Sequence, residues 1–337
     1  MTEIRVAIMG SGSWGTAFGM VLADAGCEVL MWSREAAVAR QVNEEHMNSA
    51  YHPDITLPAK LHATTDASKA LAGASIVVLA LPSQVLRANL QTWKEELAPG
   101  SVLVSLIKGI EFGTSLRMSE VIAEVTGVEP GRIAVISGPN LAGEIARRQP
   151  TATTVACADE ASALALQEAC TTDYFRPYWT TDVVGTEIGG AVKNVIALAN
   201  GIAVGMGLGE NSQASLMTRG LAEMARLGVA LGADPLTFQG LAGVGDLVAT
   251  CQSPLSRNRS FGENLGRGLS VEQTIEVTKQ TCEGYKSCQP ILDLAKLYDV
   301  EMPITEQVVA VLHHGQSPKM MASAFMSRDT KRESALT

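Results

Sequence analysis

Hydrophobic positions in the first half of the chain form short continuous runs, separated by longer segments with helical spacing. The runs lie at residues 6–9, 27–32, 76–81, 102–107, 133–136, 153–156 and 174–178. Short apolar runs that alternate with helical patterns predict the strands of a mostly parallel sheet covered by helices. One loop interrupts this alternation at residues 51–58, where Pro53 and Pro58 break both periodicities. We expect this loop to lie near the site where the sheet domain binds its ligand.

The pattern changes after about residue 182, where the strand-like runs end. Helical periodicity continues at residues 184–206, 211–231, 270–279, 288–298 and 304–313. A chain of 337 residues is also longer than one ordinary hydrophobic core requires. We therefore predict an α/β fold with two domains: a doubly wound sheet over 1–182 and an all-helical domain over 183–337, with a frayed polar tail at 327–337.

A glycine-rich turn follows the first apolar run and opens the first helix. Its sequence is Gly10-Ser11-Gly12-Ser13-Trp14-Gly15. In a strand–turn–helix context, the first glycine permits the turn, the second lets a pyrophosphate approach the backbone, and the third lets the helix pack on the strand. Such a pyrophosphate binds the helix N-terminus, where unpaired N–H groups favour an anion. The turn predicts a Rossmann-like dinucleotide site, with Gly10, Gly12, Ser13, Trp14 and Gly15 as contacts.

The end of the second predicted strand bears on which dinucleotide binds. NAD-specific sites usually carry an acidic residue about 20 residues beyond the glycines, whereas this chain has Ser33 and Arg34 there. A guanidinium suits the 2′-phosphate of NADP(H). Glu35 follows directly and favours NAD(H), and Arg34 could instead be a solvated residue at the start of a helix. We favour NADP(H), with NAD(H) as the alternative.

Composition and charge narrow the classes of partner. The formal net charge of −9 argues against nucleic acid or an anionic membrane surface. The six cysteines are scattered without a CxxC pair and there are five histidines, a pattern that favours reduced thiols over disulfides or a metal site. The first strand begins within a few residues of the N-terminus, and we expect no apolar run of membrane-spanning length. These observations predict a cytoplasmic protein without a metal.

Ligands of open α/β sheets bind beyond the carboxyl ends of the strands, so residues after each run are candidates. Lys108 follows the run 102–107 and could polarise a carbonyl or hold a phosphate, although a strand-end lysine can also simply reach into water. The turn 137–142 contains Gly138, Asn140 and Ala142 and offers backbone N–H groups at a helix start. Taken alone, it is only a favourable turn.

The helical half contributes a second set of candidates. Lys193 lies on a helix with small or apolar residues nearly all round, and burial of an ammonium is costly unless it is paired. Such a lysine suits proton transfer, and Asp246 in the segment 243–251 could pair with it. Ser256, Arg257 and Asn258 supply hydrogen-bond donors for a dianionic phosphate, although Arg259 fits a solvated basic loop equally well.

Taken together, these motifs resemble those of bacterial NAD(P)-dependent glycerol-3-phosphate dehydrogenases. The resemblance covers residues 4–320 and is most specific in Lys193-Asn194, in the run 243–251 and in the run 256–259. It implies a Rossmann-like domain, an all-helical second domain, and reduction of dihydroxyacetone phosphate to sn-glycerol 3-phosphate for phospholipid synthesis. It also implies that Lys193 exchanges a proton with the substrate, with Asp246 and Lys108 beside it.

The resemblance also implies a full set of contacts. Substrate would meet Lys108, Gly138, Asn140, Lys193, Asp246, Thr250, Ser256, Arg257 and Asn258. The dinucleotide would meet Ser13, Trp14, Arg34, Lys108, Ala142, Arg257, Thr281 and Glu283. Two residues depart from the family pattern: Asn140 stands where serine or threonine is usual, and Thr281 stands where an apolar residue is usual.

Two other functions stay open from the residues. One is another two-domain dehydrogenase, of the 3-hydroxyacid or 6-phosphogluconate type. The second is a dinucleotide-sensing protein with an inactive site, although a sensor has no need of a buried Lys193 beside Asp246. The charge-poor helix at 184–206 could also bury against a second subunit, and we expect a homodimer because dimers are the commonest assembly.

Overall fold

The structure is a computed structural model, which describes residues 4–278 and 282–327. It divides into two compact units. The first comprises Met1–Ile107 and Met118–Val183, and the second comprises Lys108–Arg117 and Val184–Thr337. The sheet unit thus ends at Val183, one residue after the predicted domain boundary. The difference is Lys108–Arg117, which the sequence analysis assigned to the sheet domain and the structure assigns to the helical unit.

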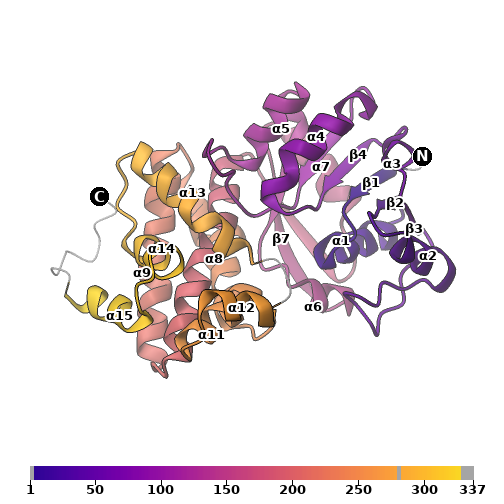
Figure 1. Cartoon of the computed structure of the whole chain (residues 1–337). Helices are drawn as coiled ribbons and strands as arrows, with labels where there is room; N and C mark the ends of the chain where they lie inside the picture. The colour runs from indigo at the N-terminus through magenta and orange to yellow at the C-terminus, as the bar shows by residue number, and fades with distance from the viewer. Residues whose placement is uncertain (1–3, 279–281, 328–337) are drawn as a thin grey trace. The chain divides into compact units, whose positions relative to one another are not determined.

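The first unit, the sheet unit, is built on eight strands in the order β3-β2-β1-β4-β5-β6-β7-β8 (Figure 1). Every neighbouring pair is parallel except β6 and β7, which are antiparallel. The strand β3 was not predicted, because its sequence Leu-His-Ala-Thr contains no continuous apolar run. The strands are β1 (Arg5–Met9), β2 (Glu28–Trp32), β3 (Leu61–Thr64), β4 (Ile76–Leu79), β5 (Val102–Ser105), β6 (Ile133–Ser137), β7 (Thr151–Cys157) and β8 (Phe175–Thr180).

Helices connect the strands of the sheet unit and bury its apolar residues. Phe18 and Phe175 meet edge to face in its core, with ring centroids 6.0 Å apart. The helices α1 and α6 pack side by side, as do α4 and α5. The helices are α1 (Ser13–Asp24), α2 (Ala36–Glu45), α3 (Ala67–Leu71), α4 (Leu86–Trp93), α5 (Met118–Thr126), α6 (Ala142–Ala146) and α7 (Glu160–Ala169), with short 3-10 turns at Ser83–Val85, Lys94–Glu96 and Pro130–Arg132.

The second unit, the helical unit, is organised around α8 (Val183–Gly205), which is buried continuously from Gly185 to Ala203. By length and composition α8 is long enough to cross a membrane, contrary to the sequence expectation, but 89% of its most apolar stretch is buried within the protein. We assign it as a core helix. The other helices are α9 (Glu210–Ala230), α10 (Asp246–Gln252), α11 (Arg257–Gly266), α12 (Val271–Thr278), α13 (Glu283–Leu297), α14 (Pro303–His313) and α15 (Pro318–Met326), with a 3-10 turn at Pro235–Gln239 and a π-helical turn at Leu241–Gly245.

Close backbone contact between α8 and α11 places the start of α11 beside the catalytic candidates of α8. A Cβ on Gly262 would lie 2.0 Å from the carbonyl oxygen of Leu198, and one on Gly201 would lie 2.1 Å from that of Arg259. Only glycine permits this approach at either position. The residues that begin α11 are thereby held next to the middle of α8. The predicted frayed tail lies outside the described residues beyond Ser327.

Candidate functional site

The glycine turn of the sheet unit packs against neighbouring backbone at Gly10 and Gly15 and leaves free space at Gly12. Gly10 has φ +132°, and a Cβ there would lie 2.4 Å from the carbonyl oxygen of Ala80. A Cβ on Gly15 would lie 2.3 Å from the carbonyl oxygen of Gly10, so α1 packs directly on the turn. By contrast, no heavy atom lies within 4 Å of a Cβ on Gly12. The turn therefore leaves room at Gly12 for another molecule to approach the backbone.

The first turn of α1 fits an anionic ligand. Gly12 is its N-cap residue, no side chain caps it, and no acidic residue lies in its first turn. The indole nitrogen of Trp14 and the amide oxygen of Asn48 are buried without a hydrogen-bond partner among the described residues. Buried polar atoms are normally paired, and a bound ligand can supply the partner. These features fit the dinucleotide that the glycine motif predicts.

The loop 46–58 is fastened to this turn. Asn48 donates hydrogen bonds to the carbonyl oxygen of Ser11 at 3.0 Å and to the hydroxyl of Thr16 at 2.9 Å. The Nε2 atom of His52 lies 2.9 Å from the carbonyl oxygen of Ser13. Burial, foremost, lowers the pKa of His52, so the neutral ring is favoured. The loop thus supports the backbone of the predicted pyrophosphate site.

The end of β2 carries the residues that the sequence predicts to distinguish NADP(H) from NAD(H). Ser33 is buried, and its hydroxyl oxygen accepts a hydrogen bond from the hydroxyl of Ser11 at 2.9 Å. Arg34 and Glu35 are both exposed. The backbone at this strand end is therefore fixed to the glycine turn, while Arg34 is accessible to a ligand phosphate.

The turn after β6 is also pinned within the sheet unit. Gly138 has φ +152°, and the amide nitrogen of Asn140 donates to the hydroxyl of Thr153 at 2.9 Å. The amide oxygen of Asn140 is buried without a partner among the described residues. Ala142 is the first residue of α6, whose N-cap has no side-chain hydrogen bond. Asn140 therefore presents an oriented amide whose oxygen can accept a ligand hydrogen bond.

In the helical unit, the predicted ion pair between Lys193 and Asp246 is present. The ammonium of Lys193 lies 2.7 Å from Oδ1 of Asp246 and donates to the hydroxyl of Thr250 at 2.6 Å. All three side chains are buried. Lys193 comes from α8, while Asp246 and Thr250 lie one turn apart on α10. A buried ammonium is tolerated here because a carboxylate and a hydroxyl both receive it.

A π-helical turn delivers Asp246 to this place. A Cβ on Gly189 of α8 would lie 2.3 Å from the carbonyl oxygen of Ala242, so the turn Leu241–Gly245 rests on the backbone of α8. This contact is one helical turn before Lys193. Asp246 follows the turn directly as the first residue of α10. Single π-helical turns are rare and often mark functional sites.

Lys108 joins the same carboxylate from a segment distant in the sequence. Its ammonium lies 2.5 Å from Oδ2 of Asp246, and 15% of its side chain is exposed. The pKa of Lys108 is lowered to about 8, foremost by burial; Asp246 opposes this shift, and the ammonium of Lys193 adds to it. Two ammonium groups therefore share one carboxylate, which leaves a net positive charge at this cluster.

The start of α11 is organised by Asn258. Its amide nitrogen donates to the amide oxygen of Asn194 at 2.8 Å, and its amide oxygen accepts from the backbone N–H of Gly284 at 2.9 Å. The side chain of Asn258 thus links α8, α11 and α13. Ser256 caps α11 by accepting from the N–H of Arg259, and Arg257 is exposed.

The structure assembles the candidates of each unit into two groups. In the helical unit, Lys108, Lys193, Asp246 and Thr250 meet, and Asn258 joins the start of α11 to Asn194 and to Gly284 in the first turn of α13, next to Glu283. In the sheet unit, the glycine turn meets Ser33 and Asn48. Thr281 lies outside the described residues. Sequence reasoning missed Asn48 and the contact of Asn194, although the pair Lys193-Asn194 was itself a signal.

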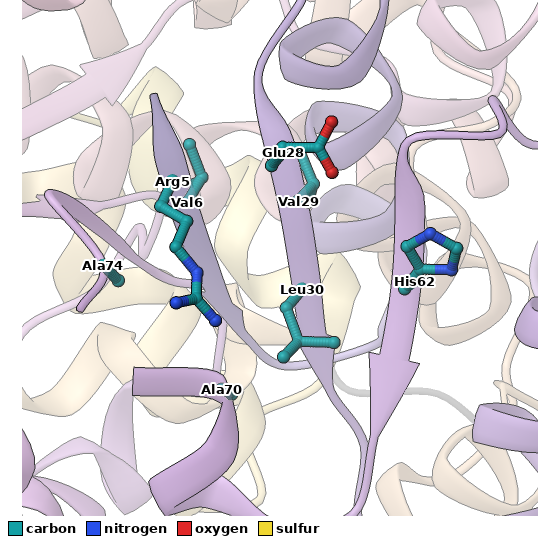
Figure 2. A pocket seen from close by; sticks show the side chains of 8 residues that line it. All are labelled: Arg5, Val6, Glu28, Val29, Leu30, His62, Ala70 and Ala74. Atoms are coloured by element: carbon teal, nitrogen blue, oxygen red, sulfur yellow. The ribbon is translucent and has the colours of Figure 1, made fainter. Parts of the chain in front are cut away.

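A separate cavity of about 150 Å³ lies near the N-terminal ends of β1 and β2 (Figure 2). It is lined by Arg5, Glu28 and His62 and by apolar residues between them. Arg5 and Glu28 are the first residues of β1 and β2, whereas the glycine turn follows the last residue of β1. None of the site residues predicted from the sequence lines this cavity. Within the described part of the chain, no three His, Cys, Asp or Glu side chains lie together as metal ligands.

Comparisons with known proteins identify the family of the chain. The family described as NAD-dependent glycerol-3-phosphate dehydrogenase matches with its N-terminal part over residues 5–163 and with its C-terminal part over residues 182–323. The chain is 62% identical over 330 residues to a Streptomyces griseus protein named glycerol-3-phosphate dehydrogenase (NAD(P)+), and the match covers 98% of each. A similarly named Thermobifida fusca protein is 60% identical over 330 residues, again covering 98% of each.

Solved structures point the same way. Glycerol-3-phosphate dehydrogenase from Coxiella burnetii has a TM-score of 0.92 and 36% identity, covering 97% of this chain and 99% of its own. The enzyme from Saccharomyces cerevisiae has a TM-score of 0.82 and 27% identity, covering 96% and 99%. By family match, relatives and fold, this chain belongs to the NAD-dependent glycerol-3-phosphate dehydrogenases.

Proposed function

We propose that the protein catalyses the reversible reduction of dihydroxyacetone phosphate to sn-glycerol 3-phosphate with NAD(P)H, supplying the glycerophospholipid backbone. The observation that carries this proposal is the buried cluster of Lys108, Lys193, Asp246 and Thr250 in a chain of this family. A small phosphorylated ketone offers a carbonyl oxygen for the ammonium groups and a dianion for Arg257. The enzyme thus acts on a phosphorylated small molecule.

The sheet unit supplies the residues for the dinucleotide. The open position at Gly12 and the first turn of α1 suit the pyrophosphate, and Trp14 and Asn48 have buried polar atoms to offer. Arg34 suits a 2′-phosphate, which favours NADP(H), with NAD(H) as the alternative. When bound, the dinucleotide supplies the hydride for C2 of the ketone.

The start of α11 supplies the residues for the substrate phosphate. The guanidinium of Arg257 is exposed and can form paired, charge-assisted hydrogen bonds with phosphate oxygens. The N-terminal end of α11 has no acidic residue in its first turn and therefore favours an anion. Asn258 holds this turn against α8, so a bound phosphate would fix C2 at a set distance from Lys193.

The lysine cluster supplies the proton. As the C2 carbonyl becomes an alkoxide, Lys193 transfers a proton from its ammonium to that oxygen, and in the reverse direction it accepts the proton of the alcohol. Asp246 and Thr250 orient the ammonium, and Lys108 keeps a positive charge beside the developing alkoxide. Because the cluster is buried, these charges act in a medium that screens them weakly.

The test is oxidation of NADPH, and separately of NADH, followed by absorbance after addition of dihydroxyacetone phosphate to the purified protein. We expect rapid oxidation, faster with NADPH, and loss of turnover in Lys193→Ala with little change in NADPH affinity. Turnover with a 3-hydroxyacid or 6-phosphogluconate instead would establish a different dehydrogenase. Dinucleotide binding without turnover on any of these substrates would indicate a sensor, and near-normal turnover in Lys193→Ala would remove Lys193 from its role.

We also propose a homodimer located in the cytoplasm. All six cysteines are buried and free, which suits a reducing compartment. Dimers are the commonest assembly of enzymes of this size. Sedimentation at micromolar concentration tests the assembly, since a species of monomer mass would contradict it.

A further inference from the structure

The segment Lys108–Arg117 forms a small hairpin that belongs to the helical unit. Ile110 and Arg117 pair in an isolated antiparallel bridge, and the N–H of Glu111 donates to the carbonyl oxygen of Leu116 at 2.9 Å. Gly113 and Ser115 take left-handed conformations and close the hairpin. Because Arg117 pairs with Ile110, a shift of Arg117 also moves Ile110, which lies two residues from Lys108.

An ion pair fastens this hairpin to α8. The guanidinium of Arg117 donates to Oε2 of Glu187 at 2.6 Å, with 14% of the arginine side chain and 3% of the glutamate side chain exposed. Ile110 is fully buried in the core of the helical unit beside it. Loss of one partner would remove a close counter-charge from the other buried charge, which is unfavourable. The hairpin would then lose one of its fixed attachments to α8.

We propose that Arg117 and Glu187 are positioning residues for the reaction: their ion pair holds the hairpin on α8 so that the ammonium of Lys108 meets Asp246. This inference rests on the proposed function and extends it to two residues that need not touch the substrate.

The two lysines of the cluster depend on this pair to different extents. Lys193 lies on α8 itself, six residues after Glu187, and the helix backbone sets its place. Lys108 reaches the same carboxylate from the hairpin, which is joined to α8 by the ion pair of Arg117 and is anchored by Ile110 in the core of the helical unit. Breaking the ion pair therefore displaces Lys108 and leaves the contact between Lys193 and Asp246 in place. A general loss of structure would disturb both lysines.

The first experiment is a double-mutant cycle with dihydroxyacetone phosphate as substrate. Arg117→Met should lower kcat/KM by up to about 100-fold, because small misplacements of an active-site group are that costly. Arg117→Lys keeps a charge for Glu187 and should restore most of the activity. In a Lys108→Met background, Arg117→Met should have little further effect, because the group that it positions is already gone.

A matched pair on the sheet unit serves as control. Arg87 and Glu124 also form a 2.7 Å ion pair, but one that is more exposed and belongs to the sheet unit. Arg87→Met should leave kcat/KM near that of the unmodified protein. Losses from Lys108→Met and Arg117→Met that simply multiply in the double variant would overturn the proposal, because Arg117 would then act independently of Lys108.

A second experiment does not depend on turnover. Reductive methylation of lysine amines with formaldehyde and cyanoborohydride, quantified by peptide mass spectrometry, reports how accessible each ammonium is. In Arg117→Met we expect Lys108 to be labelled several-fold faster and Lys193 at its original rate. Equal acceleration at both lysines, or at neither, would overturn the proposal. Selective labelling of Lys108 in a protein that does not turn over dihydroxyacetone phosphate would uphold the positioning role and reject the proposed function.

Discussion

Lys108 and Lys193 bind opposite oxygens of one buried carboxylate, at 2.5 Å and 2.7 Å from Asp246. The two lysines are 85 residues apart in the sequence and come from a hairpin and a core helix. One carboxylate cannot neutralise two ammonium groups, so the cluster keeps a positive charge in a buried position. Such a charge is suited to an oxygen that becomes negative during a reaction.

Asp246→Asn should therefore be more damaging than its small change in shape suggests. The amide keeps the size of the carboxylate but removes the negative charge that two buried ammonium groups share. We expect kcat to fall by on the order of 100-fold or more, as for loss of an acid–base group. Steady-state kinetics with dihydroxyacetone phosphate measures this. An equal loss in the exposed control Asp54→Asn would show that the effect is not specific to the cluster.

The activity should also depend on the protonation of Lys108. Its pKa is lowered to about 8, chiefly by burial. The charged form predominates below that value, so kcat/KM for ketone reduction should fall as the pH rises through about 8. Lys108→Met should have a lower kcat/KM and lack this alkaline decline. A decline unchanged in Lys108→Met would assign it to another group.

Arg34 should distinguish the two dinucleotides. Arg34→Leu removes the only guanidinium that we assign to the 2′-phosphate. A hydrogen bond to a charged group contributes about 1.5–3 kcal/mol. We therefore expect KM for NADPH to rise on the order of 10-fold to 100-fold, while KM for NADH stays nearly constant. Arg40→Leu, an exposed arginine on α2, is the control. Equal effects on both dinucleotides would remove Arg34 from the 2′-phosphate.

Glu223 makes the stability of the helical unit depend on pH. Its carboxylate is buried and accepts hydrogen bonds from the backbone N–H groups of Ile304 and Thr305 at the start of α14. Burial, foremost, raises the pKa of Glu223 to about 7, and these hydrogen bonds oppose the shift. In the unfolded chain the carboxyl loses its proton near its ordinary value, about 4.3.

The sign of this effect follows from the raised pKa. Between about pH 4.3 and pH 7 the unfolded chain gives up a proton that the folded protein keeps, so the free energy of unfolding falls as the pH rises. The contribution is about 4 kcal/mol across this window, at 1.36 kcal/mol per pKa unit, and constant above it. Urea titrations at several pH values measure it. Glu223→Gln should remove this part of the slope, whereas Glu276→Gln, exposed on α12, should retain it; an unchanged slope in Glu223→Gln would contradict the assignment.

Much of the fold could be predicted because burial leaves a strong trace in the sequence. Seven of the eight strands coincide with apolar runs, and α8 could be recognised from its continuous small and apolar residues. The exception, β3, is four residues long and alternates buried and exposed side chains. The antiparallel direction of β7 could not be predicted, because strand direction depends on pairing with β6 and not on local periodicity.

The site was predictable where its chemistry is local. The glycine turn carries its geometry in six consecutive residues, and Lys193 could be recognised because a charge on an apolar helix requires a partner. The connections of Asn258 could not be predicted: its amide was expected on a phosphate, and the structure places it between Asn194 and Gly284. Both amide groups were already in the sequence, but nothing local relates residues 64 positions apart.

The sequence by itself determined the class of fold, the dinucleotide turn and the residue types of the chemistry, because these follow from local periodicity and from the cost of burying charge. Only the tertiary structure decided that the hairpin Lys108–Arg117 belongs to the helical unit, that two lysines share Asp246, and that Arg117 meets Glu187. Each of these contacts joins segments that the chain separates by more than fifty residues. Their energies depend on distances that exist only after the helices have packed.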